Sequence, residues 1–280
     1  DGAVMGYTEP TDEFFSACLG WQERRHGWTP QREWVVTSPG VVPAIFNAVR
    51  TLTSPGDGVI VQPPVYYPFF MAVEKSGRRI VRNPLVQDRQ DGRLRYRMDF
   101  DDLERKAADP ANTMLVLCSP HNPVGRVWTR EELEGIANFC LKHNLYLIAD
   151  EIHNDLIFKD HIVMNKISEQ LAERTILCTA PSKTFNLAGL QASNIIIQNE
   201  ELRNKFKQLL NNLHIGGCNV FVDSVVIAAY TQCDQWLDEL NAYIKSNMDY
   251  FSEQVNAIAP LKMWNPEGTY LVQCRSARWQ

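Results

Sequence analysis

The sequence predicts an α/β fold in which helices cover both faces of a mostly parallel sheet, followed by part of a smaller α+β domain. From about residue 37, short runs of β-branched and apolar residues alternate with stretches of helical periodicity. Several of these runs are apolar at nearly every position, which is typical of strands buried on both faces of a parallel sheet. After about residue 219 the alternation gives way to long helical stretches.

The elements follow in a regular order along the chain. The first half contains predicted helices at 43–52 and 67–77, the second ending at Gly77, and predicted strands at 57–64, 78–85 and 113–120. The next helix begins at Thr129, where Thr129 and Glu132 form the pattern of a capping box, and its apolar period runs to Asn144. Three further strands are predicted at 145–150, 175–181 and 193–199, then helices at 200–213, capped by Asn199, and at 235–258.

We expect three parts in the chain. Residues 1–36 form an N-terminal segment that belongs to a small domain. Residues 37–240 form a large domain that contains the sheet, and residues 241–280 begin an incomplete C-terminal small domain. The chain does not start with Met, and its last stretch, TYLVQCRSARWQ, stops just after what looks like a strand, so we expect further native residues at both ends.

Composition excludes several classes of function. The formal net charge is −5 and no basic run is present, which argues against a nucleic-acid partner. No apolar run reaches the ~20 residues that a membrane span needs. The seven cysteines form no C-x-x-C pair, and several lie in apolar patterns, which indicates reduced thiols in the cytoplasm. The sequence indicates no metal site.

Polar residues gather where the predicted strands end. Asn122 follows the strand at 113–120 between two prolines, Asp150 ends the strand at 145–150, and Lys183 follows the strand at 175–181. Gly40 precedes a predicted helix, whose free N–H groups suit a phosphate. Each residue alone is more often a cap, a turn or a solvated side chain. Because ligands of such sheets bind at the carboxyl ends of the strands, the set together matches a cofactor with an aldehyde, a phosphate and a ring nitrogen.

Longer stretches of the chain resemble a known family. They are SPGVVPAI, VIVQPPVYYPFF, SPHNPVGRVWTREEL, ADEIHNDLIF, APSKTFNLAGLQASNIII and PEGTYLV, together with FSACLGWQERRHGW near the start. The chain resembles the fold-type I pyridoxal-phosphate enzymes of the aminotransferase class I and II superfamily. It is most similar to their cystathionine β-lyase, or carbon–sulfur β-lyase, branch.

The resemblance implies roles around the ring of pyridoxal 5′-phosphate. Lys183 would attach the cofactor as a Schiff base and later carry protons. Asp150 would pair with the pyridinium nitrogen, and Asn122 would bind the ring hydroxyl group. Tyr66 would stack on one face of the ring and Ile152 would pack against the other.

The resemblance also implies how the phosphate is held. The backbone of Gly40, Val41 and Val42 and the hydroxyl group of Ser182 would bind it. Tyr7 matches a tyrosine that reaches the phosphate of the neighbouring subunit, which implies a homodimer with sites built across the interface.

Two departures from the aminotransferase pattern favour the lyase branch. His153 stands among the cofactor-binding positions where aminotransferases usually have tyrosine, and Gln191 stands where they usually have a phosphate-binding arginine. The predicted activity is β-elimination on sulfur-containing L-amino acids to give a thiol, pyruvate and ammonia. An aminotransferase and a cofactor-binding regulatory protein remain alternatives. The arginine that grips the substrate carboxylate in this family has no match here, because Arg275 and Arg278 lie too close to PEGTYLV.

Overall fold

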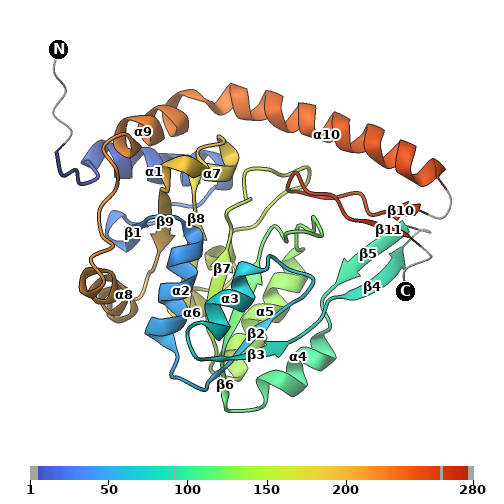
Figure 1. Ribbon diagram of the computed structural model, residues 1–280, viewed down its shortest axis with the longest axis horizontal. Coiled ribbons are helices and arrows are strands. Elements are labelled where there is room, and N and C mark those ends of the chain that lie inside the picture. Colours follow the sequence, from blue (N-terminus) through green and yellow to red (C-terminus); the bar gives the residue numbers. More distant parts are fainter. Residues whose placement is uncertain (1–5, 91–92, 259–260, 277–280) are drawn as a thin grey trace.

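A seven-stranded sheet forms the centre of the molecule (Figure 1), as seen in a computed structural model that describes residues 6–90, 93–258 and 261–276. The strand order is β1-β9-β8-β7-β6-β2-β3. The bounds are β1 (Val35–Ser38), β2 (Gly58–Val61), β3 (Arg79–Arg82), β6 (Asn112–Cys118), β7 (Tyr146–Asp150), β8 (Thr175–Thr179) and β9 (Ser193–Ile196). Strands β3, β2, β6, β7 and β8 are parallel, whereas β9 runs antiparallel to β8 and β1. The predicted mostly parallel sheet is confirmed, with one strand reversed near its edge.

Helices cover both faces of this sheet, as predicted. One face packs against α2 (Val41–Leu52), α3 (Pro68–Glu74) and α8 (Glu200–Asn212), and the other against α4 (Phe100–Ala107), α5 (Arg130–Lys142) and α6 (Glu169–Ala172). The position of β6 between the two layers of helices explains why its residues from 114 to 118 are all apolar. Met114 and Val116 contribute to the first core, whereas Leu115 and Leu117 contribute to the second.

The predicted helix starts are confirmed in detail. The Thr129 side chain accepts from the N–H of Glu132 while the Glu132 carboxylate accepts from the N–H of Thr129, so both halves of the capping box form. Asn199 caps α8 by accepting from the N–H of Leu202. These contacts satisfy backbone donors that a helix leaves free at its N-terminus.

A third core lies above the sheet, between helices that are far apart in sequence. Helix α1 (Asp12–His26) packs against α9 (Val222–Gln232), and Figure 1 shows α10 (Asp234–Ala257) running from α9 across the molecule. Residues of all three helices bury one another, including Trp21, Val226 and Leu237. Helix α1 was not predicted from the sequence, although Thr11 caps its start and Gly27 ends it in the left-handed conformation.

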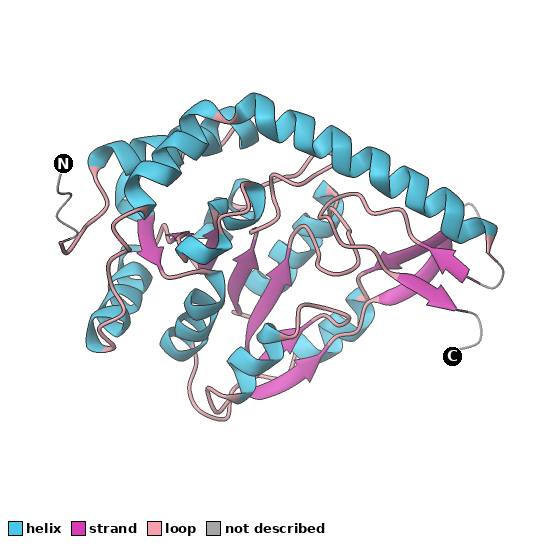
Figure 2. Ribbon diagram, turned by 45° about the horizontal axis from the view of Figure 1, so that its top comes forward, coloured by secondary structure: helices cyan, strands magenta, loops and turns pink. Residues whose placement is uncertain are grey.

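Two small hairpins and several short turns complete the described residues. Strands β4 (Val86–Gln90) and β5 (Arg93–Arg97) pair with each other, as do β10 (Leu261–Met263) and β11 (Cys274–Ser276), which Figure 2 shows beside the central sheet. The short helices are η1 (Arg32–Trp34), η2 (Met164–Lys166), α7 (Pro181–Thr184) and η3 (Ala188–Leu190). The strand expected in the last stretch of the chain corresponds to β11, whereas residues 269–273 form a loop. Arg275 lies in β11, and Arg278 lies outside the described residues.

Two general properties of the chain can be checked against the described residues. All seven cysteines are free thiols, and Cys18, Cys118, Cys140 and Cys178 are buried. None of the described helices combines the length and apolar character that crossing a bilayer requires.

Candidate active site

A pocket of about 380 Å³ opens at the carboxyl ends of β6, β7 and β8. This volume lies in the range typical of small-molecule sites. Ten of the eleven residues predicted from the sequence line it: Gly40, Val41, Val42, Tyr66, Asn122, Asp150, Ile152, His153, Ser182 and Lys183. The parallel strands therefore bring together what the sequence separates by more than 140 positions.

Asp150 supplies a buried carboxyl group at the end of β7. It lies between Cys118 of β6 and Cys178 of β8 in the sheet register, and its side chain accepts from the N–H of Ile152 at 3.1 Å. Burial raises the pKa of the Asp150 carboxyl group to about 7, against the effects of the Ile152 hydrogen bond and the Lys183 charge. Such a carboxylate is stabilised by a cation or a charged N–H donor placed in the pocket.

Lys183 supplies an amine opposite that carboxyl group. It lies on α7, a single helical turn that begins at Pro181 directly after β8. Lys183 lines the same pocket as Asp150, His153 and Tyr66, and its charge acts to lower the pKa of each of them, against burial in the case of Asp150 and Tyr66. The fold places the amine, the carboxyl group and two rings around one pocket.

His153 supplies an imidazole ring with free nitrogens. The side chain is buried, and neither ring nitrogen has a hydrogen-bond partner among the described residues. Burial and the Lys183 charge lower the pKa of His153 to about 4, so the ring is neutral at neutral pH. Buried polar atoms rarely stay unpaired, and these two are suited to a polar ligand in the pocket.

The start of α2 supplies backbone donors on another side of the pocket. Gly40 caps the helix with φ of 105°, a value that favours glycine. The first bond of the helix runs from the N–H of Ala44 to the carbonyl of Gly40, and Pro43 has no N–H group. The N–H groups of Val41 and Val42 are therefore the free donors at this N-terminus, where an anion is favoured.

Asn122 and Tyr66 are held by contacts between their two loops. The N–H of Tyr66 donates to the carbonyl of Asn122 at 3.0 Å, and the N–H of Asn122 donates to Cys118 Sγ at 3.3 Å. Both side chains line the pocket, and Tyr66 also packs edge-on against Phe69. The loop that follows β6 thus positions an amide and an aromatic ring together.

Tyr270 and Leu271 also line the pocket, and the sequence reading gave them no role. They belong to the loop before β11, and the ring of Tyr270 lies edge-on to His153 at 5.8 Å between centroids. Arg126, fully buried, binds Glu267 at 2.9 Å and thereby fixes this loop on the sheet. The motif PEGTYLV contributes to the family resemblance of this segment. Because the segment does not follow one of the predicted strands of the sheet, the sequence did not predict that it lines the pocket.

Tyr7 is the predicted residue that the structure places outside the pocket. It is exposed and lines a second hollow. That hollow shares Pro39 and Gln191 with the pocket, so the two lie side by side on the surface.

The fold and the pocket define a class of protein in which a lysine, a buried carboxylate and a helix N-terminus meet at the carboxyl edge of a parallel sheet. The family model described as "Aminotransferase class I and II" matches residues 2–276. The chain belongs to this family. The prediction of a fold-type I pyridoxal-phosphate enzyme from the carbon–sulfur lyase branch is confirmed.

Individual relatives agree with this assignment. Cystathionine beta-lyase PatB of Bacillus subtilis is 44% identical over 275 residues, which cover 97% of this chain and 70% of that protein. Cystalysin of Treponema denticola, whose crystal structure contains pyridoxal 5′-phosphate, superposes with a TM-score of 0.93 at 43% identity, covering 97% of this chain and 69% of its own. The C-S lyase of Staphylococcus hominis, bound to its inhibitor L-cycloserine, gives a TM-score of 0.91 at 32% identity, covering 99% and 68%.

Proposed function

We propose that this protein is a carbon–sulfur lyase that uses pyridoxal 5′-phosphate to eliminate a thiol from Cβ of sulfur-containing L-amino acids. The observation that carries the proposal is the pocket itself, in which Lys183, the buried Asp150 and the free donors of α2 face one space. The reaction consumes water and yields the thiol, pyruvate and ammonia. The names of PatB and of the Staphylococcus hominis enzyme support the same reaction class.

The residues present fit the cofactor. Asp150 is a carboxyl group whose pKa is raised by burial, and a protonated ring nitrogen beside it would favour its charged form. The unpaired nitrogens of His153 and the amide of Asn122 match the polar edge of the ring. Tyr66 and Ile152 supply the two ring contacts.

The phosphate has its own set of donors. The N–H groups of Val41 and Val42 and the hydroxyl group of Ser182 would bind it, with Gly40 allowing the backbone to approach. The fit includes no arginine, because Gln191 lines the pocket where aminotransferases of this family usually have one. Backbone donors therefore carry more of the phosphate charge.

The chemistry divides between cofactor and chain. When bound, the cofactor supplies an aldehyde for the substrate amine and a protonated ring that withdraws electrons from Cα. The Lys183 amine removes the proton from Cα and returns it to the departing sulfur. Asp150 keeps the ring protonated, and His153 stays neutral, so it adds no second positive charge beside Lys183.

Supplying cystathionine without any oxo acid tests the reaction class. We expect the holoenzyme to release pyruvate continuously, because elimination needs no amino acceptor. Pyruvate is measured by coupled reduction, with S-methylcysteine as a second substrate and alanine, which has no leaving group, as the control. An aminotransferase, the alternative suggested by the name of the family, would form product only after an oxo acid is added. A regulatory protein would show the bound cofactor and no turnover with either substrate.

We also propose that the active form is a homodimer in which Tyr7 reaches the phosphate of the neighbouring subunit. Support comes from the exposed Tyr7 and from the hollow beside the pocket. Mixing Lys183→Ala and Tyr7→Ala subunits by unfolding and refolding should restore about a quarter of wild-type activity, because half of the dimers then contain one intact site. The measurement is pyruvate release, with each variant refolded alone as the control. No recovery in a mixture shown to contain hybrid dimers would contradict the shared site.

A further inference from the structure

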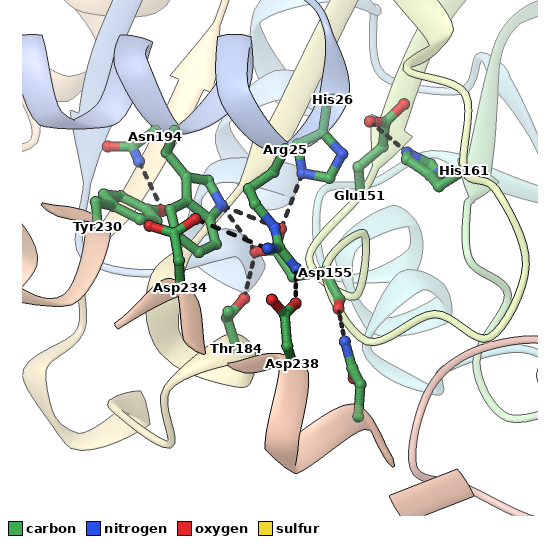
Figure 3. A network of polar contacts seen from close by, with 12 residues as sticks. Arg25, His26, Glu151, Asp155, His161, Thr184, Asn194, Tyr230, Asp234 and Asp238 are labelled. Carbon is green, nitrogen blue, oxygen red and sulfur yellow. Dashed lines mark hydrogen bonds and ion pairs between the residues drawn. The ribbon is translucent and has the colours of Figure 1, made fainter. Parts of the chain in front are cut away.

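A buried carboxylate, Asp155, lies directly behind the turn that carries Lys183. Its Oδ2 accepts from the hydroxyl group of Thr184 at 2.6 Å. Its Oδ1 accepts from Trp21 Nε1 at 3.0 Å and lies 2.9 Å from His26 Nε2 (Figure 3). The carboxylate thus joins two segments, α1 and α7, that are far apart in sequence.

Asp155 is ionised although it is buried. Burial raises the pKa of its carboxyl group, but the contacts with His26, Thr184 and Trp21 outweigh burial, and the pKa lies below its usual range. Its backbone carbonyl accepts from Asn241 Nδ2 of α10 at 2.8 Å. A buried charge with this many donors is held in one position, because each lost partner leaves it poorly solvated.

The loop that carries Asp155 begins directly after Asp150, the last residue of β7, and also carries His153. It is fixed at its other end by Glu151, whose carboxylate lies 3.0 Å from His161 Nε2 and accepts from the N–H of Met164 at 2.8 Å. Both side chains of the Glu151–His161 pair are buried, and the His161 ring lies edge-on to the ring of His26 at 5.9 Å between centroids (Figure 3). Asp155 is therefore held in a fixed position beside the turn that carries Lys183.

The turn that carries Lys183 is short, and a contact outside its own backbone is needed to fix its orientation. Helix α7 has four residues, and it ends with two backbone hydrogen bonds of 2.9 Å, from the N–H of Phe185 to the carbonyl of Pro181 and from the N–H of Leu187 to the carbonyl of Ser182. A single turn does not hold its orientation by its own backbone bonds. Thr184 is fully buried and adjacent to Lys183, so its bond to Asp155 sets the direction in which the lysine leaves the turn.

We propose that Asp155 is a positioning residue that fixes the Lys183 turn relative to Asp150, an inference that rests on the proposed role of Lys183. Through Trp21 and His26 the same carboxylate ties this arrangement to α1. The N-terminal helix therefore takes part in placing the lysine, although in the described structure it contributes no residue to the lining of the pocket.

Thr184→Val tests this, because it removes one hydroxyl group and leaves Asp155 its partners on α1. We expect kcat for pyruvate release to fall on the order of tenfold with KM little changed, since small misplacements of a reacting group are costly. We also expect the absorption band of the lysine-bound cofactor to titrate at a pH displaced by about half a unit or more, because the separation of the Lys183 and Asp150 charges changes. Thr184→Ser keeps the hydroxyl group and should restore both values.

Thr175→Val is the matched control. Thr175 is buried at the other end of β8, and its hydroxyl group donates to the carbonyl of Leu171 at 2.8 Å. It should lower Tm about as much as Thr184→Val while leaving kcat and the titration of the band unchanged. Equal effects of the two valine variants on the band and on kcat would overturn the proposal, as would failure of Thr184→Ser to restore them.

The titration of the band separates this inference from the proposed reaction, since it needs the cofactor and no sulfur substrate. A displaced titration in Thr184→Val alone supports positioning even in a protein that releases no pyruvate. A wild-type protein without a lysine-bound band would overturn the positioning role together with the cofactor assignment.

Discussion

Replacing Lys183 by alanine should reduce pyruvate release from cystathionine by about 10⁴-fold or more. The substitution removes the amine that holds the cofactor and the group that moves the Cα proton, and general acid–base catalysis alone contributes up to about 10⁴-fold. The lysine lines the same pocket as Asp150, His153 and Tyr66, and its charge acts on the pKa of each of them. In the described structure no second lysine lines this pocket to take its place.

The measurement is pyruvate release together with the absorption spectrum of the bound cofactor. We expect the lysine-bound band to disappear, and small primary amines added to the solution to restore a fraction of the rate by accepting the Cα proton. Lys207→Ala, on the exposed side of α8, is the control for a lost lysine charge and should keep full activity. Thiol release at the wild-type rate from Lys183→Ala would contradict the assignment.

Much of the pocket could be predicted because its residues follow the ends of parallel strands. Asn122, Asp150 and Lys183 come after β6, β7 and β8, which are neighbours in the sheet, so a prediction of strand positions already placed these residues at one edge. Gly40 could be added because a glycine before a helix start is visible in the sequence. Their specific roles came from the resemblance to a family.

The remaining contacts depend on packing between segments that no local pattern connects. Tyr270 reaches the pocket through a loop fixed by the buried pair of Arg126 and Glu267. Asp155 meets Trp21 across 134 positions of sequence. The reversed direction of β9 was not visible either, because a buried strand has the same apolar composition in both directions.

Replacing Asp150 by asparagine should abolish most of the activity and at the same time stabilise the protein stripped of its cofactor at alkaline pH. The activity falls because a neutral amide no longer keeps the ring nitrogen protonated, and loss of one such electrostatic contact typically costs on the order of 10²–10³-fold in kcat. The stability rises because the substitution removes a buried carboxylate whose burial is not offset by the Lys183 charge in the cofactor-free protein.

The sign of the pH dependence follows from the raised pKa. The carboxyl group of Asp150 has a pKa of about 7 in the folded chain and an ordinary value of 3.8 when exposed, so between these values the folded state binds more protons. The free energy of unfolding of the cofactor-free protein therefore falls as pH rises from about 4 and through 7, by a total on the order of 4 kcal/mol. Asparagine does not titrate and removes this part of the pH dependence.

Denaturant unfolding of the cofactor-free proteins at pH 5 and pH 8 measures the effect. At pH 8 Asp150→Asn should be more stable than the wild-type chain by a few kcal/mol, and by much less at pH 5. With the cofactor bound, the wild-type protein should be more stable than Asp150→Asn at pH 8, because the ring nitrogen pairs with the wild-type carboxylate and stabilises it. Glu253→Gln, an exposed position on α10, is the control and should leave both curves unchanged. If cofactor-free Asp150→Asn were less stable than the wild-type chain at pH 8, Asp150 would already be compensated in the empty pocket, and its role as the partner of the ring nitrogen would lose its physical basis.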